Sequence, residues 1–333
     1  MTNCPDTLTS TSAPHEVQLQ QTVDVLDGAT SVTILCHVQP DADTIGSGLA
    51  LGIVFARKGV PVQVAFASPD KLPVSMEGLP GTELLVPAAA VAEKADLLVT
   101  VDCGSAGRLG SLASRLDGAR RSLVIDHHRS NTRYGMLNLI DDSAESTTAV
   151  LVKLFDLWGV PIDADLAHCL YAGLVTDTGS FRWAQEGTHT LAERLLSTGI
   201  DGAAIARSLL DTHPFGWLPM LGSVLSSAVL ARDAVGGRGL VHAVIRCSDW
   251  AGLGSEEVES VIDIVRTTVE AEVAAVLKES APGSWSVSLR SKGSVDVAAV
   301  AERLGGGGHR FAAGYTASGA DDSVIAALRE ALG

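Results

Sequence analysis

The sequence predicts an α/β fold with two domains, the first of which is built on a doubly wound parallel sheet. The chain has 333 residues, which is enough for two domains that each bury a core. Apolar residues make up 46% of it and aromatic residues only 4%, so the cores must be aliphatic, as is usual where helices pack on a parallel sheet. Short, continuous apolar runs also alternate with helical segments, and this alternation is typical of βαβ units.

The elements of the first domain follow from this alternation. We expect strands over residues 31–38, 61–67, 95–102 and 121–128, and helices over residues 44–59, 147–160 and 164–179. A helical stretch broken by loops is expected at about 185–218. The pattern of apolar residues changes after it, and apolar runs at 240–246, 272–279, 284–292 and 312–318 predict strands with helices between them. The sequence therefore predicts an N-terminal domain over 19–200, a helical linker over 201–218 and a smaller α/β domain over 219–333.

Composition excludes several classes of protein. The five cysteines are scattered and form no CxxC pair, which argues against a disulfide framework or a thiolate zinc site and favours a reducing, cytoplasmic location. No run approaches the roughly 18 apolar residues of a membrane span. Residues 1–18 lack the features of a signal peptide, and we interpret them as a polar tail. The net charge of −15 argues against binding of long nucleic acid, so a phosphate-bearing substrate should be short.

Acidic and histidine side chains gather where the predicted strands of the first domain end. In an open parallel sheet, ligands bind outside the carboxyl ends of the strands, so side chains far apart in sequence converge there. The first strand is followed by His37, Asp41 and Asp43, and the third by Asp102. The fourth is followed by Asp126, His127 and His128, and a helix ends at Asp177.

Each of these motifs by itself has a simpler interpretation. A single aspartate after a strand is more often a helix cap or turn former, and the Asp-His-His triplet could be a hydrogen-bonded pair without metal. Their joint occurrence favours a metal site, because so many carboxylates in one crevice would repel each other without cations. Carboxylate and imidazole ligands without thiolate suit Mn²⁺ or Mg²⁺, with Fe or Co²⁺ as alternatives. Two ions that share a carboxylate catalyse displacement at phosphorus, so the residues predict a dinuclear phosphoesterase site.

Five segments also carry a resemblance to a known family. The segments HVQPDADTIGS, VTVDCGS, VIDHHRSN and LVTDTGSF, in this order, resemble the four motifs of the DHH phosphoesterase superfamily. The segment GGGGHRFAAG, at 305–314, resembles the signature of its DHHA1 partner domain. The resemblance covers the chain after about residue 18 and is nearest to the group of oligoribonucleases (nano-RNases) and pAp phosphatases that includes phosphodiesterases of cyclic di-AMP and pApA.

This resemblance implies roles for the residues of the site. One ion is expected on His37, Asp41 and Asp102, and the other on Asp43, Asp102, His127 and Asp177, with Asp102 bridging. A hydroxide between the ions would attack the phosphorus. Asp126 would orient an imidazole, and His128 would face the scissile phosphate. The resemblance also implies two ions, with Mn²⁺ preferred and Mg²⁺ or Co²⁺ as alternatives, an active-site cleft between the two domains, and a homodimer.

The glycine-rich segment predicts a phosphate clamp. Glycines let backbone N–H groups approach an anion, and a following helix N-terminus would favour negative charge. The predicted clamp residues are Gly307, Gly308, His309 and Arg310, and the resemblance adds Arg290 and Ser291. Arg108 and Arg129 lie near the metal motifs and could reach phosphates or be surface charges, and Phe181 could stack on a base or belong to the core.

The sequence therefore predicts a metal-dependent hydrolase of short nucleotides. Expected substrates are pApA and other very short oligoribonucleotides, 3′-phosphoadenosine 5′-phosphate (pAp) and cyclic di-AMP. Two alternatives stay open. One is a single-strand exonuclease of the RecJ type, although the chain has no room for the extra nucleic-acid-binding domain. The other is a nucleotide- or RNA-binding sensor without catalysis, against which the complete set of metal ligands argues.

Overall fold

The computed structural model describes residues 14–333, and these form two compact units. The first unit comprises residues 14–70, 78–127 and 133–205. The second comprises residues 71–77, 128–132 and 206–333. The long stretches of the two units divide between Ile205 and Ala206, inside a helix. Each unit has its own sheet and its own core.

The first unit is built on a five-stranded sheet in which every neighbouring pair of strands is parallel. Its strands are β1 (Val32–Leu35), β2 (Val62–Ala65), β3 (Leu97–Val101), β4 (Arg121–Asp126) and β5 (Leu137–Ile140), in the spatial order β2-β1-β3-β4-β5. After β1 the chain moves outward to β2 and then returns to β3 on the other side of β1. The strand order therefore reverses between β1 and β3, where the parallel register pairs Leu35 with Thr100. Such a reversal opens a crevice at the carboxyl ends of the two strands.

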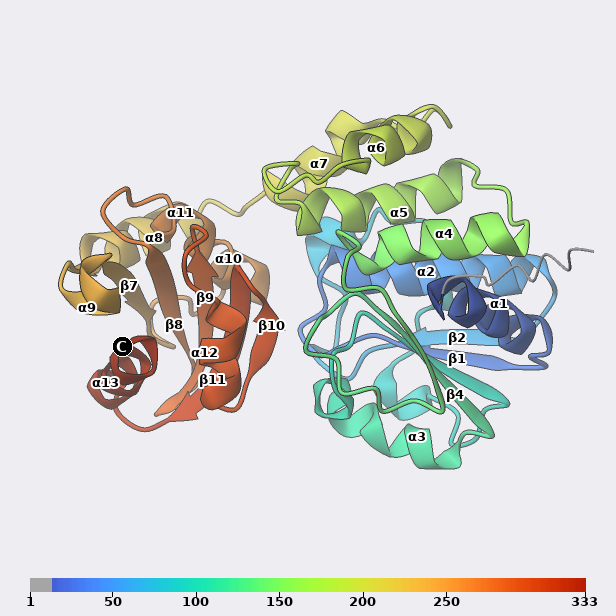
Figure 1. Cartoon of the computed structure of the whole chain (residues 1–333), viewed down its shortest axis with the longest axis horizontal. Coiled ribbons are helices and arrows are strands. Elements are labelled where there is room, and N and C mark those ends of the chain that lie inside the picture. Colours follow the sequence, from blue (N-terminus) through green and yellow to red (C-terminus); the bar gives the residue numbers. More distant parts are fainter. Residues whose placement is uncertain (1–13) are drawn as a thin grey trace, which may run out of the picture. The chain divides into compact units, whose positions relative to one another are not determined.

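Helices cover one face of this sheet in successive layers (Figure 1). Against the sheet lie α1 (Pro14–Asp27), α2 (Ala42–Arg57) and α4 (Thr147–Trp158), and α5 (Ala164–Asp177) packs on α2 and α4. Outside α5 follow α6 (Thr188–Leu196) and α7 (Gly202–Leu210). The opposite face carries short 3-10 turns and α3 (Arg115–Gly118), packed through an apolar cluster that includes Leu98, Leu109 and Leu112. Because α2 is enclosed by sheet and α5, residues 42–55 are all buried.

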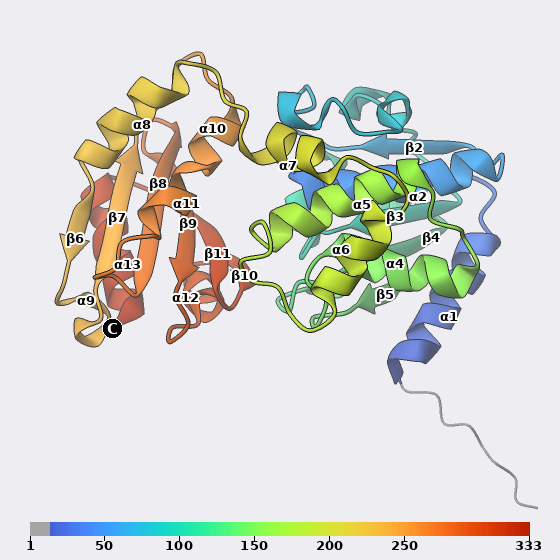
Figure 2. The same ribbon diagram turned by 90° about the horizontal axis from the view of Figure 1, so that it is seen from above.

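The second unit is built on a mixed six-stranded sheet. Its strands are β6 (Val229–Ala231), β7 (Leu240–Ile245), β8 (Val273–Ala281), β9 (Ser284–Ser291), β10 (Gly307–His309) and β11 (Ala312–Ser318). Figure 2 shows them side by side in the order β10-β11-β9-β8-β7-β6, in which only β7 and β8 run parallel. Its helices are α8 (Trp217–Ser226), α9 (Ala234–Gly237), α10 (Ser255–Glu259), α11 (Val261–Val265), α12 (Val297–Arg303) and α13 (Asp321–Leu332).

Alternating residues of β8 supply both cores of the second unit. Val273, Ala275 and Leu277 pack with α12 and α13, whereas Ala274 and Val276 pack with α8, α10 and α11. Successive side chains of a strand point to opposite faces of its sheet, and here helices cover both faces, so both sets of side chains are buried.

The structure confirms the predicted fold class of a parallel sheet followed by a second α/β unit, and it adds several elements. Among those that the sequence did not predict are α1, α3, β5, β6, β10, α13 and the 3-10 turns. Of the predicted polar tail, residues 1–13 lie outside the described residues, and residues 14–18 begin α1, so that interpretation is wrong there. Within residues 14–333, no helix combines the length and the apolar character that crossing a bilayer requires.

Candidate active site

Six of the predicted metal-binding residues meet at the carboxyl ends of β1, β3 and β4, all within the first unit. His37 and Asp102 follow β1 and β3, on either side of the point where the strand order reverses. His127 follows β4 directly, and Asp177 is the last residue of α5. Asp41 and Asp43 stand at the start of α2. The crevice expected at this edge of the sheet is therefore lined by carboxylates and imidazoles.

Asp41 caps a helix and also faces the cluster of carboxylates and imidazoles. Its Oδ1 accepts hydrogen bonds from the backbone N–H groups of Asp43 and Thr44, each at 3.1 Å. This is the usual role of an aspartate at the N-cap, and it starts α2 at residue 42, two residues before the predicted start. The other oxygen, Oδ2, lies 3.5 Å from Nε2 of His37. One oxygen of the Asp41 carboxylate thus caps the helix, and the other faces His37, where a metal ligand was predicted.

The carboxylate oxygens form two groups, each around the Nε2 atom of one histidine. His37 Nε2 lies 3.5 Å from Asp41 Oδ2 and 3.4 Å from Asp102 Oδ2. His127 Nε2 lies 3.1 Å from Asp177 Oδ2, 3.6 Å from Asp102 Oδ1 and 4.0 Å from Asp43 Oδ2. Asp102 belongs to both groups and turns a different oxygen toward each histidine. This is the arrangement that a bridging carboxylate needs.

The hydrogen bonding of His127 fits a metal ligand. Its Nδ1 lies 3.1 Å from the carbonyl oxygen of Ala144, to which only a protonated Nδ1 can donate. The neutral ring of that tautomer offers its Nε2 lone pair to a cation. Without one, burial lowers the pKa of this imidazole, but the hydrogen bond to Asp177 and the surrounding carboxylates raise it well above its ordinary value, so a proton on Nε2 takes the place of the cation. A backbone partner that holds the second ring nitrogen is the common arrangement around metal-bound histidines. The donor set of oxygen and imidazole nitrogen suits the divalent ions named above.

Charge is crowded in this site. Asp43, Asp102, His37 and His127 are each at most 3% exposed. Burial raises the pKa of Asp102 well above its ordinary value, and the neighbouring Asp43, Asp41 and Asp177 raise it further. Burial also raises the pKa of Asp177 to about 7, with Asp43 adding to the effect. Bound cations would relieve this repulsion, and the residues therefore fit a metal centre.

A layer of residues that the sequence analysis missed surrounds these carboxylates. Thr147 and Thr148, in the first turn of α4, donate hydrogen bonds to Asp43 and Asp102. Gly173 of α5 lies against the same Asp43 carboxylate. The run Ser146-Thr147-Thr148 at the start of a predicted helix was the available signal, since short polar residues there hold anions. Which anion they hold depends on tertiary structure.

Two further predicted residues lie beside the carboxylate–imidazole groups. Asp126, which is fully buried, accepts a 2.8 Å hydrogen bond at Oδ1 from the backbone N–H of His127. Arg108 places Nη2 at 2.9 Å from Nδ1 of His37, and the carbonyl oxygen of Val38 lies 2.9 Å from the same nitrogen. A guanidinium only donates, whereas a carbonyl only accepts, so these two contacts of the ring nitrogen are alternatives.

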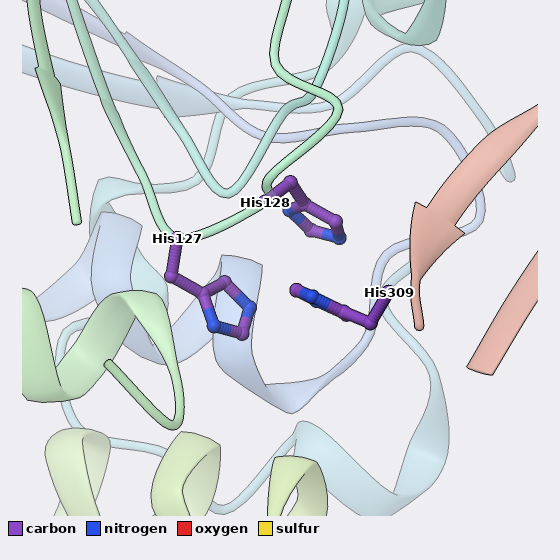
Figure 3. Close-up of side chains that lie close together, drawn as sticks. All are labelled: His127, His128 and His309. Atoms are coloured by element: carbon purple, nitrogen blue, oxygen red, sulfur yellow. The ribbon is translucent and has the colours of Figure 1, made fainter. Parts of the chain in front are cut away.

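The remaining predicted substrate residues belong to the second unit. His128 stacks on His309, with ring centroids 4.4 Å apart and planes inclined by 20°. Figure 3 shows this stack. Ser130 donates to the carbonyl oxygen of Gly308 and accepts from its N–H. The segment 128–132 thus contacts the glycine-rich strand β10 at two places.

The glycine-rich segment differs from its prediction. No helix follows the glycines; β10 turns back into β11, with Gly308 paired to Ala313, so the expected helix N-terminus is absent at this place. The glycines have a packing reason. Gly308 has φ of +142°, and a Cβ there would lie 2.6 Å from Cα of Ala313. A Cβ on Gly306 would lie 2.1 Å from the carbonyl oxygen of Gly314.

Four basic or polar candidates line the end of this sheet or the loop beside it. Arg310 is exposed at the turn between β10 and β11, with its guanidinium 5.4 Å from the ring of Phe311. Arg290, on β9, donates to the carbonyl oxygen of Leu289, and Ser291 donates its hydroxyl to Glu272 at 3.0 Å. Arg129 is exposed.

Phe181 lines an open pocket of the first unit. Its ring lies 5.4 Å from that of His189 and 6.3 Å from that of Tyr171, measured between centroids. Its φ of +64° is unusual for an aromatic residue and continues a left-handed run from Gly179 and Ser180. The ring therefore packs at the rim of a pocket rather than within the core.

Comparison with known proteins agrees with this geometry. Residues 31–174 match the model of the DHH family N-terminal domain, and residues 237–333 match that of the DHHA1 domain. A bifunctional oligoribonuclease and PAP phosphatase NrnA from Thermus thermophilus is 32% identical over 313 residues, which cover 90% of each chain. The cyclic-di-AMP phosphodiesterase PdeA from Listeria monocytogenes is 25% identical over 86% of this chain and 44% of its own length.

A solved structure shares the whole fold. The crystal structure of an exopolyphosphatase-related protein from Bacteroides fragilis superimposes with a TM-score of 0.82, at 23% identity, and covers 98% of this chain and 97% of its own. The two domain matches, the extended identity to the Thermus protein and the carboxylate–histidine edge of the sheet lead to one conclusion. The chain belongs to the DHH/DHHA1 family of phosphoesterases.

Proposed function

We propose that this protein uses two divalent metal ions to hydrolyse phosphoester bonds of short nucleotides. The observation that carries the proposal is the pair of carboxylate–imidazole groups that share Asp102, whose two oxygens lie 3.4 Å and 3.6 Å from different histidines. Two ions joined by one carboxylate are the arrangement used for in-line displacement at phosphorus. The proposed ions are Mn²⁺, with Mg²⁺ or Co²⁺ as alternatives.

In this proposal each group of residues holds one ion. The first group is His37, Asp41 and Asp102, and the second is Asp43, Asp102, His127 and Asp177. Bound there, the ions would lower the pKa of a water molecule and stabilise negative charge on the phosphoryl oxygens. Ala144 keeps the proton of His127 on Nδ1, and Asp126 holds the backbone N–H of the same residue.

The second unit supplies the proposed contacts to the substrate. His128 is the candidate for protonating the leaving oxygen, because an imidazole can exchange a proton near neutral pH. His309, Arg310 and the N–H groups of Gly307 and Gly308 are candidates for holding phosphate, and Arg290, Ser291 and Arg129 are further candidates of the same unit. Arg108, which belongs to the first unit, is a further candidate there. The proposed substrates are pApA and other very short oligoribonucleotides, pAp and cyclic di-AMP. The names of the Thermus and Listeria relatives support this choice.

A substrate panel tests the proposal. Full-length protein with Mn²⁺ is assayed on pApA, pAp, cyclic di-AMP, a pentaribonucleotide, a long RNA and a long single-stranded DNA, and products are separated by ion-exchange chromatography. We expect hydrolysis of at least one of the short substrates and a steep decline in rate with length. The matched control is Asp102→Asn, which keeps the shape of the side chain and should be inactive.

Other outcomes would point to other functions. Processive degradation of the long strands would favour a RecJ-like exonuclease. Tight stoichiometric binding without any product would favour a nucleotide sensor. Unchanged activity of Asp102→Asn would refute the two-ion arrangement. Sedimentation of the same sample tests the proposed homodimer.

A further inference from the structure

We propose that the first turn of α4, through Thr147 and Thr148, is a positioning element that decides which oxygens of Asp43 and Asp102 reach the ions. This inference rests on the proposed function and deepens it. Both threonines are buried, with exposures of 0% and 1%, and neither was assigned a role by the ligand motifs. They come from a helix that contributes no ligand of its own, so they act through the two carboxylates they contact.

Asp43 is held so that only one oxygen remains for metal. Its Oδ1 accepts from both the backbone N–H and the hydroxyl of Thr148, at 2.9 Å and 2.8 Å. A carboxylate oxygen has two lone pairs, so these two donors occupy Oδ1. Oδ2 accepts one hydrogen bond, at 2.7 Å from the N–H of Thr147, and lies 4.0 Å from His127 Nε2. Asp43 should therefore bind its ion through Oδ2 alone.

Asp102 is held by the same turn in the orientation that a bridge requires. The hydroxyl of Thr147 donates to its Oδ1 at 3.0 Å, which fixes rotation of the carboxylate. Oδ1 then faces His127 and Oδ2 faces His37. Because Thr147 donates its N–H to Asp43 and its hydroxyl to Asp102, one residue sets the spacing between a carboxylate of α2 and one at the end of β3.

Gly173 closes this arrangement from the side of α5. A Cβ at Gly173 would lie 2.3 Å from Oδ1 of Asp43 and 2.6 Å from the hydroxyl of Thr148. Both are closer than any side chain could tolerate, so one of the two groups would have to move. Glycine inside a helix is less favourable than alanine, because it loses more conformational freedom on folding. The close approach of α5 to the Asp43 carboxylate is a physical reason for a glycine in the middle of this helix.

Metal binding by four variants tests this inference. Thr148→Val removes the hydroxyl at nearly constant volume, Thr148→Ser retains it, and Gly173→Ala disturbs the same carboxylate from the other helix. The control is Thr22→Val, in α1, where an equally buried threonine donates to the carbonyl oxygen of Gln18 at 2.8 Å and touches no ligand. Mn²⁺ affinity and stoichiometry are measured by competition with a chromophoric chelator, and folding is followed by circular dichroism.

We expect Thr148→Val to lower the affinity for one of the two Mn²⁺ ions by about 10- to 100-fold, the range found for residues that orient metal ligands. Thr148→Ser and Thr22→Val should bind like the wild type, and Gly173→Ala should show the Thr148→Val defect. At saturating Mn²⁺, Thr148→Val should keep the wild-type KM for pApA and recover much of its kcat, which a loss of folding would not allow.

The remaining outcomes separate the two proposals. If the wild type binds two ions and Thr148→Val binds them with unchanged affinity, this inference is overturned and the proposed function stands. An equal defect in Thr22→Val would also overturn it, because the loss would then reflect stability alone. Wild type that binds no pair of ions would overturn both.

Discussion

Replacing Asp177 with asparagine separates two effects on protein stability: the loss caused by the Asp177 charge in the metal-free site, and the gain when that carboxylate binds metal. Asp177 ends α5, its side chain is 23% exposed, and its Oδ2 lies 3.1 Å from His127 Nε2. Burial, with Asp43 adding to it, raises its pKa from an ordinary 3.8 to about 7. Asparagine has nearly the same shape but cannot ionise.

The size and sign of the effect follow from this pKa. A rise of roughly three pKa units corresponds to about 4 kcal/mol. The folded carboxyl keeps its proton after the unfolded chain has released its own, so unfolding becomes easier as the pH rises from about 4 to about 7. Metal-free wild type should lose stability over this interval, and ionisation of Asp177 should account for up to about 4 kcal/mol of the loss, less whatever the His127 imidazolium restores. Asp102, whose pKa is also raised, adds to the loss in wild type and variant alike. Asp177→Asn should lack only the share that comes from Asp177.

Calorimetry of the full chain measures this. For a unit of this size, 1 kcal/mol shifts Tm by about 2–4 °C. In EDTA, Asp177→Asn should melt several degrees above wild type at pH 8 and together with it at pH 4. With Mn²⁺ the order should reverse at pH 8, because the variant lacks a ligand. The control is Asp165→Asn on the same helix, whose side chain is 58% exposed. A wild-type Tm that does not change between pH 4 and 8 in EDTA, or a variant that melts lower there, would refute the reasoning.

Other perturbations have equally definite outcomes. His127→Ala should lose bound Mn²⁺ in elemental analysis, whereas His128→Ala should keep it and turn over more slowly; equal metal loss in both would contradict the division of roles. Mn²⁺ affinity of the wild type should rise between pH 5.5 and 8, because protons compete for the buried carboxylates, and an affinity independent of pH would contradict their raised pKa values. Gly308→Ala should destabilise the second unit in urea by about 1–3 kcal/mol. The matched Gly293→Ala has the same strained backbone, with φ of +146°, but no atom within 4 Å of its Cβ, so a smaller loss there isolates the clash.

Local pattern was sufficient for the long elements and insufficient for the short ones. The runs that became β1, β3 and β4 are continuously apolar because helices or turns cover both faces of their sheet, and this burial is visible in the sequence. In contrast, β6 and β10 have three residues each and exist through pairing with β7 and β11. Three residues carry no periodicity, so such strands are decided by their partners.

What the sequence determined by itself is the chemistry of the site. Acidic and histidine residues directly after apolar strands must meet at one edge of a parallel sheet, and that topological rule predicted their convergence before any coordinates. Only the tertiary structure decided how their atoms are shared. Asp102 turns one oxygen to each histidine, and Thr148 occupies one oxygen of Asp43. These orientations depend on contacts between residues about 45 and 105 positions apart. The sequence specifies which side chains arrive at the site, but orientations set by such distant partners have no local pattern.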